Sequence, residues 1–150
     1  MKMKKTRKDL IKKVQDAYEV GGFKYYLEKN TWEVLSYPDD ENVVFSDIDL
    51  YEDVLSKLQA NVESYVEIPL PSSSEVFIVM EDFTDTIHNL FQQDMLMRAI
   101  NGPKPYKQFR FALEDTGLLK DWHQFRDKAY QKIADRWVDE FLERYEQKVS

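Results

Sequence analysis

Cysteine is absent from this 150-residue chain, and histidine occurs only as His88 and His123. Without cysteine, the chain has no disulfide, catalytic thiolate, zinc finger or iron–sulfur cluster of its own. Two histidines cannot supply a site with several histidine ligands within one chain. Glycine occurs only four times, at positions 21, 22, 102 and 117, so a glycine-rich phosphate loop is also absent. These absences exclude several large classes of enzyme and leave no cofactor to expect.

Long apolar runs are missing as well. No stretch of about 18 apolar residues occurs, and the charged N-terminus leads into Leu10 and Ile11 without an unbroken apolar segment. We therefore expect no membrane span, no signal peptide and a cytoplasmic location. The 43% hydrophobic and 14% aromatic content is ample for a core, so we expect one α+β domain over residues 1–150, with residues 1–5 as a disordered basic arm.

Charge is plentiful but unevenly spread. The protein is acidic, with a net charge of −7, which argues against a protein that binds nucleic acid over its whole surface. Residues 1–13 carry seven bases and one acid, or +6, so the remainder carries −13. The densest acidic run covers residues 39–53, and no base occurs between Lys29 and Lys57. The basic segment either forms a solvated helix face or folds against this acidic run in its own chain or in a second copy.

Periodicity predicts the elements of the first half of the chain. A helix over residues 6–20 is expected to end at Gly21-Gly22. Strands over 23–28 and 32–37 form a hairpin whose turn places Asn30 at positive φ. A short strand over 43–45, a helix capped by Ser46 and a strand over 62–68 follow. The buried positions expected on the Ser46-capped helix are Ile48, Tyr51, Val54, Leu55 and Leu58.

The second half of the chain is predicted to be helical. Ser72 and Glu75 have capping-box spacing and open a helix whose apolar positions are Val76, Val79, Met80, Phe83, Ile87 and Leu90. Asp94 is expected to cap a short helix that Gly102 closes, and Pro105 begins another that Gly117 ends. The last helix, residues 118–145, buries one stripe composed of Trp122, Phe125, Ala129, Ile133, Trp137 and Phe141.

The predicted fold class is therefore α+β. A small antiparallel sheet of three to four strands packs against five to six helices, and the C-terminal helix is long. Trp122 and Trp137 are expected to be structural, and replacing either by alanine should cost about 3–5 kcal/mol.

Glu81, Asp85 and His88 form a weak candidate metal site. Their spacing of i, i+4 and i+7 places them on one face of the predicted helix, as a carboxylate-rich site would need. That face lies opposite Phe83 and Ile87, so its simplest interpretation is a solvated acidic surface. We assign no catalytic residue, and Ser72 lies in neither a Gly-x-Ser-x-Gly nor a Ser-x-x-Lys motif.

A basic island is the stronger local signal, because no acid occurs between Met95 and Leu113. Tyr106 and Phe109 fit a buried stripe, whereas Phe111 lies about 200° from Phe109 around the helix, on the charged face. An exposed ring beside Lys and Arg suits base stacking or a protein interface, unless it packs under a loop. With the start of the last helix included, the binding candidates are Arg98, Lys104, Tyr106, Lys107, Arg110, Phe111, His123 and Arg126.

Four stretches together resemble uncharacterised protein family 0158. They are YYLEKNTWEV (25–34), MEDF (80–83), RAINGPKPYKQFRFAL (98–113) and residues 122–141. The resemblance implies a bacterial cytoplasmic protein with a single fold and no known activity. Two departures stand out. The family usually has glycine where this chain has Trp32, and a Gly-Lys-Gly loop where this chain has Gly102-Pro103-Lys104-Pro105.

The sequence leaves three hypotheses for function. The first is a non-enzymatic protein–protein interaction or regulatory module, monomeric or homodimeric, whose partner is another protein. The second is a nucleic-acid-binding accessory protein that uses the basic aromatic patch. The third, carboxylate-dependent metal hydrolysis, rests only on Glu81, Asp85 and His88.

Overall fold

The chain folds into two compact units. The computed structural model describes residues 5–39 and 48–145, with the side chains of 48–50 left out. We call residues 1–70 and 133–150 the sheet unit and residues 71–132 the helical unit. The last helix, α6 (Leu119–Tyr145), gives its first half to the helical unit and its second half to the sheet unit. The single domain expected from the sequence stays a prediction.

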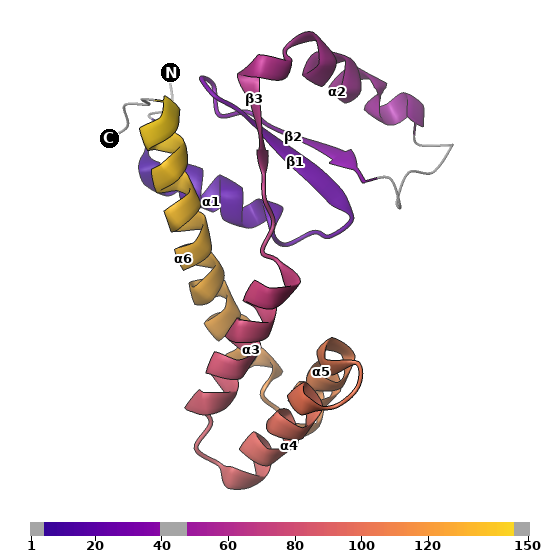
Figure 1. Ribbon diagram of the computed structural model, residues 1–150, viewed down its shortest axis with the longest axis vertical. Helices are drawn as coiled ribbons and strands as arrows, with labels where there is room; N and C mark the ends of the chain where they lie inside the picture. Colours follow the sequence, from indigo (N-terminus) through magenta and orange to yellow (C-terminus); the bar gives the residue numbers. More distant parts are fainter. Residues whose placement is uncertain (1–4, 40–47, 146–150) are drawn as a thin grey trace. The chain divides into compact units, whose positions relative to one another are not determined.

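The described part of the sheet unit holds three antiparallel strands in the order β2-β1-β3 (Figure 1). The central strand, β1 (Phe23–Glu28), pairs with β2 (Val34–Pro38) and with β3 (Tyr65–Ile68). Leu27 lies opposite Val34 on one side and Val66 on the other, so these three apolar residues share a face. The described strands and six helices confirm the α+β class. The strand predicted over 43–45 lies outside the described residues.

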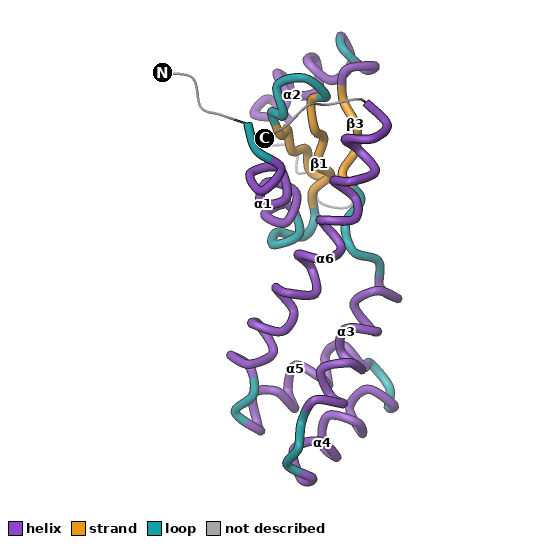
Figure 2. The backbone as a smooth tube through the Cα atoms, turned by 90° about the vertical axis from the view of Figure 1, so that its left-hand side faces the viewer, coloured by secondary structure: helices purple, strands orange, loops and turns teal. Residues whose placement is uncertain are grey.

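One face of the sheet packs against α1 (Arg7–Ala17) and the second half of α6. Figure 2 shows α1 beside the strands. Helix α1 begins after Thr6, whose hydroxyl accepts a hydrogen bond from the Asp9 backbone N–H at 3.1 Å, and it ends three residues before the predicted position 20. The buried residues of this core are Leu10, Val14, Ala17, Leu27, Trp32, Ile68, Ala134, Val138 and Phe141.

The hairpin turn places Trp32, and not Asn30 as predicted, at positive φ. Trp32 has φ 64°, and its side chain is only 2% exposed. Its backbone N–H donates to Glu28 O at 3.0 Å, and its carbonyl accepts from Lys13 Nζ at 2.9 Å. The left-handed conformation costs a non-glycine residue about 1–2 kcal/mol. Burial of the indole and the two hydrogen bonds hold the residue there, which local turn preferences could not reveal.

Helix α2 (Ile48–Ala60) lies near the edge strand β2. Its Tyr51 ring is 6.0 Å from Tyr37 in an edge-on arrangement, but Tyr51, Val54 and Leu58, predicted to be buried, are only partly buried. Leu55, predicted to be buried, is exposed. The predicted strand over 62–68 is shorter, because residues Val62–Ser64 form a 3-10 turn, η2, before β3. The predicted Ser46 cap lies outside the described residues.

The helical unit contains α3 (Ser73–Thr86), α4 (Leu90–Asn101), α5 (Pro105–Thr116) and the first half of α6. The capping box is confirmed, because Glu75 N–H donates to Ser72 Oγ at 3.1 Å and Ser72 N–H donates to the Glu75 carboxylate at 3.0 Å. No described helix combines the length and apolar character needed to cross a bilayer.

The boundary between α3 and α4 differs from the prediction. Helix α3 ends at Thr86, and α4 begins at Leu90, after the Asn89 side chain accepts from Gln92 N–H at 2.9 Å. Asn89, not Asp94, is therefore the N-cap. Leu90, predicted on the buried stripe of α3, is 80% exposed. The apolar spacing continues from α3 into α4, so the predicted helix ran past Thr86. Only the cap geometry at Asn89 shows where one helix ends and the next begins.

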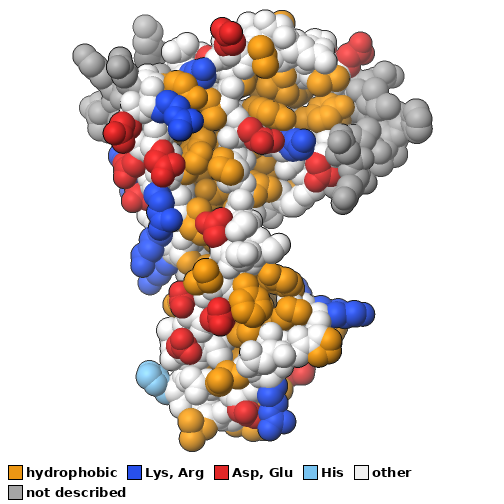
Figure 3. All heavy atoms as spheres, in the orientation of Figure 1, with side chains coloured by type: hydrophobic (Ala, Val, Ile, Leu, Met, Phe, Trp, Pro, Cys, Tyr) orange, Lys and Arg blue, Asp and Glu red, His pale blue; other side chains and the backbone are white. Residues whose placement is uncertain are grey.

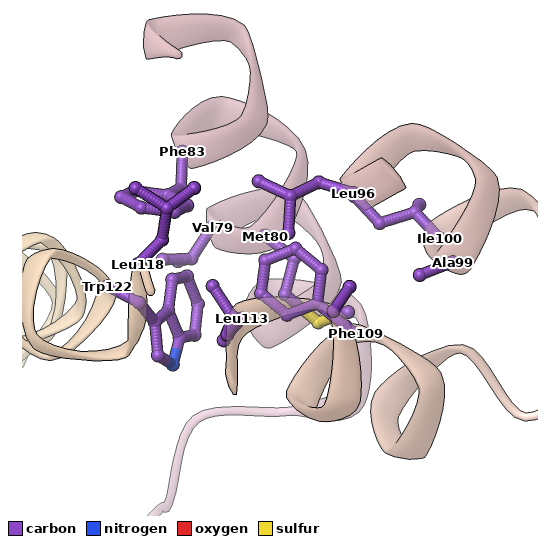
Figure 4. Packing of buried hydrophobic residues seen from close by; sticks show 11 residues of the cluster. Val79, Met80, Phe83, Leu96, Ala99, Ile100, Phe109, Leu113, Leu118 and Trp122 are labelled. Carbon is purple, nitrogen blue, oxygen red and sulfur yellow. The ribbon is translucent and has the colours of Figure 1, made fainter. Parts of the chain in front are cut away.

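The four helices of this unit enclose one core (Figure 4). The Trp122 ring lies edge-on to two phenylalanine rings. Its centroid is 5.5 Å from that of Phe83 and 5.1 Å from that of Phe109. Trp122 is thus buried as predicted. The other labelled residues of this core are Val79, Met80, Leu96, Ala99, Ile100, Leu113 and Leu118.

In the second half of α6, Phe141 is buried as predicted, but the two preceding buried positions lie one residue later than predicted. Ala134 and Val138 are fully buried, whereas Ile133 and Trp137, which immediately precede them, are only partly buried. Trp137 stacks on Phe141, with centroids 5.4 Å apart. Both stripes are apolar, so periodicity alone did not distinguish them.

Candidate functional site

The eight predicted binding residues all lie in the helical unit, but they fall on two surfaces. Tyr106, Arg110, His123 and Arg126 line a pocket between α5 and α6, which we call the α5–α6 pocket. Arg98 and Phe111 line a groove between α4 and α5, the α4–α5 groove. Lys104 and Lys107 line neither cavity. The division follows from helix geometry, since Arg110 and Phe111 differ by about 100° around α5.

The α4–α5 groove has a volume of about 450 Å³ and opens to solvent. Its lining is largely apolar, with polar groups from Arg98, Gln108 and Asp115. Phe111 is 47% exposed at this groove, and Lys107 Nζ lies 5.9 Å from its ring centroid. Phe111 therefore lies on the charged face, as the helical phase predicted. The apolar lining residues are Met95, Ala99, Pro103, Phe111 and Ala112.

Helix α4 adds an apolar residue that the sequence analysis missed. Phe91 is 73% exposed and lies one turn before Met95, so it is on the same side of α4 as the groove. The sequence spacing of Phe91, Met95 and Arg98 at i, i+4 and i+7 could have placed Phe91 on this side of the helix. Figure 3 shows other apolar side chains at the surface of the helical unit among charged ones.

Acidic side chains flank the basic island. Arg98 Nε lies 2.9 Å from Asp94 Oδ2, and Arg110 Nε lies 3.4 Å from Glu114 Oε1, each pair one helical turn apart. Both carboxylates stand just outside the acid-free stretch of sequence, so they partly neutralise its arginines. Lys104 and Lys107, both exposed, keep positive charge on α5 and the loop before it.

The α5–α6 pocket is smaller, about 230 Å³, and contains side chains from α3, α5 and α6. Tyr106, predicted to be buried, is exposed, but its hydroxyl donates to Ser73 O at 2.8 Å. His123 and Arg126 lie one turn apart on α6, and the Arg126 guanidinium carbon is 5.6 Å from the Tyr130 ring centroid. The structure thus brings four of the predicted residues to one cavity.

The metal candidate loses its geometric basis. His88 follows the end of α3 at Thr86, so Glu81, Asp85 and His88 do not project from one helical face. Across residues 5–39 and 48–145, no three His, Asp or Glu side chains are grouped as a metal site requires.

The basic N-terminal helix contacts α6 through Arg7. Arg7 Nε donates to Asp139 Oδ1 at 3.1 Å, and the guanidinium also pairs with the Asp135 carboxylate. The hydrogen bond to Asp139 raises the pKa of Arg7 above its ordinary value, against a lowering by burial. Arg7 of the basic segment therefore pairs with α6 of the same chain. Residues 40–47 of the acidic run and residues 1–4 of the predicted arm lie outside the described residues. Lys5 contacts Asn30 O.

Fold and cavities define a small α+β protein whose candidate binding surfaces lie on its helical unit. The chain belongs to the uncharacterised protein family UPF0158, which matches residues 5–149. No curated protein and no solved structure matches it.

The two departures from the family pattern coincide with unusual backbone. Trp32 and Lys104, with φ 64° and 51°, are the non-glycine residues at positive φ in the part of the chain that the structure describes. The glycine that the resemblance implies at the first position and the Gly-Lys-Gly loop that it implies at the second would suit this conformation, because glycine adopts it without steric cost.

Proposed function

We propose that this protein is a non-enzymatic interaction module whose α4–α5 groove binds a short acidic segment of another protein. The carrying observation is Phe111, 47% exposed at an open apolar groove. The segment would be an amphipathic helix or turn that inserts an apolar side chain between Phe111 and Met95. The bacterial source, the cytoplasmic location and the monomeric or homodimeric state stay predictions.

The apolar lining supports this proposal through the hydrophobic effect. Burial of apolar surface contributes about 25 cal/mol per Å² before the entropic costs of association are subtracted, and aromatic residues are frequent anchors of interfaces. Phe91 extends the apolar surface along α4 by one turn from Met95, which suits a helix laid along the groove with anchors at i, i+3 or i+4.

The lysines beside the groove support an acidic ligand. The charged lining residues Arg98 and Asp115 balance each other, but Lys107 on α5 lies beside the Phe111 ring and Lys104 is exposed just before α5, whereas the whole chain carries −7. A local basic region on an acidic protein favours encounter with an acidic segment. The contribution would fall with salt, because exposed charges are screened beyond about 8 Å at physiological ionic strength.

Single-stranded nucleic acid is the second candidate, since the same lysines and Phe111 would suit phosphates and bases. The apolar lining of the groove favours the protein ligand. The ion pairs Arg98–Asp94 and Arg110–Glu114 do not discriminate, because their carboxylates oppose the phosphates of a nucleic acid and the carboxylates of an acidic peptide alike.

The test is selection of binding peptides of about 12 residues from a random library, followed by measurement of affinity. Enriched peptides should combine Leu, Phe or Trp with Asp or Glu. Phe111→Ser should weaken their binding by about tenfold or more. Met97→Ser is the matched control, because Met97 is 48% exposed in the same unit and does not line the groove.

Two results would contradict the proposal. The first is an equal loss of affinity for Met97→Ser and Phe111→Ser. The second is enrichment of peptides without acidic or apolar residues. Tight binding of a single-stranded oligonucleotide at about 50 mM salt, with a steep loss by about 200 mM, would instead support the nucleic-acid candidate.

A further inference from the structure

We propose that the α5–α6 pocket is a separate binding site for a small organic carboxylate with an aromatic or branched apolar group. The pocket lies within the helical unit and does not include Phe111 or Met95, so the inference is independent of the function proposed for the α4–α5 groove.

The donors of this pocket come from two helices. Arg110 follows Tyr106 by one turn on α5, while His123, Arg126 and Tyr130 are spaced at successive turns on α6. Two arginines, a histidine and two tyrosines therefore line one cavity, and no Asp or Glu is among its lining residues. The Tyr106 hydroxyl already donates to Ser73 O, so the N–H groups of Arg110, His123 and Arg126 are the donors suited to an anion.

Both arginines have neighbouring carboxylates outside the lining. Arg110 Nε is 3.4 Å from Glu114, and an Arg126 terminal nitrogen is 3.3 Å from Asp127. A guanidinium carries five N–H donors in a fork, so a contact with one neighbouring carboxylate is compatible with binding a second one.

The remaining lining of the pocket is mainly apolar, so it favours a ligand whose second part is an apolar group. Trp122, Phe109 and Leu113 are buried residues of the helical core that also line this cavity. Its volume of about 230 Å³ equals roughly eight water molecules at about 30 Å³ each. This space fits one ring or a short branched chain. A ligand that places its carboxylate at Arg110 and Arg126 would place its ring or branched chain against Trp122.

Calorimetric titration of the whole protein with phenylacetate, indole-3-acetate and hexanoate tests this site. At least one carboxylate should bind, and its uncharged amide should bind about tenfold more weakly or worse. Arg110→Gln and Arg126→Gln should each reduce carboxylate affinity by about tenfold or more. The matched control is Arg98→Gln, because Arg98 is also an exposed arginine with a carboxylate one turn away but lines the other groove.

The outcomes separate this site from the proposed peptide groove. Phe111→Ser should leave carboxylate binding within about twofold of wild type, even if peptide binding is lost. Absence of binding at about 5 mM ligand for all three carboxylates would overturn the inference. So would equal affinity for acid and amide, or an equal effect of Arg98→Gln and Arg110→Gln. If Arg126→Gln fails to fold by circular dichroism, Arg110→Gln alone decides the result.

Discussion

Trp32 offers a prediction in which two effects of known size oppose each other. Its indole is buried in the core of the sheet unit, and its backbone has φ 64°. Replacement by either alanine or glycine removes the indole, at a cost of about 3–5 kcal/mol. Only glycine also relieves the left-handed backbone, worth about 1–2 kcal/mol. The extra freedom of glycine in the unfolded chain offsets about 0.4–1 kcal/mol of that gain.

The expected order of stability is therefore wild type, then Trp32→Gly, then Trp32→Ala. The free energy of unfolding of Trp32→Gly should exceed that of Trp32→Ala by about 0.8 kcal/mol, the difference between the central values of these two contributions. The wild type remains above both because the lost burial is larger than the relieved strain.

Trp122 provides the matched control, because it is equally a buried tryptophan but lies within α6 at ordinary helical backbone. There glycine should be less stable than alanine by about 0.8–1.0 kcal/mol. The two sites should thus reverse the sign of the glycine-minus-alanine difference.

Urea denaturation followed by far-ultraviolet circular dichroism measures all four variants, because this signal does not depend on the tryptophan removed. Midpoints should shift at unchanged denaturant dependence. If alanine matches or exceeds glycine at position 32, or if the sign is the same at both positions, the assigned backbone strain is refuted.

Two further predictions concern a helix cap and a titrating turn. Asn89→Ala should lower the free energy of unfolding by about 1 kcal/mol, whereas Asp94→Ala should lower it by less than about 0.5 kcal/mol. Urea denaturation measures both changes. A larger loss for Asp94→Ala would show that Asp94, and not Asn89, caps α4. Burial opposes the charged form of Glu28, but hydrogen bonds from Thr31 and Asn30 lower its pKa below the ordinary value. Because the folded-state pKa is depressed, the carboxylate stabilises the fold above about pH 5 and this contribution is lost as pH falls through the folded pKa. Glu28→Gln should therefore cost more stability at about pH 7 than at about pH 3, and an equal cost at both would count against the turn described here.

Residue patterns predicted part of the candidate site. Phe111 was placed on the charged face of α5 by its phase relative to Phe109, and its exposure agrees. The same arithmetic did not separate the basic island into two cavities, because a cavity requires a second helix and sequence spacing is silent about which helices are neighbours. Asp94 and Glu114, just outside the acid-free stretch, pair with its arginines through contacts one turn apart.

The sequence by itself determined the α+β class, the Ser72–Glu75 capping box, the Pro105 and Gly117 bounds of α5 and the long last helix, because these depend on periodicity and local hydrogen bonding within a few residues. Only the tertiary structure decided which apolar stripe of α6 is buried around Val138 and which turn residue takes positive φ. At both places the local sequence allows two solutions of similar energy. Burial of large side chains, worth several times the local preference, selects one of them.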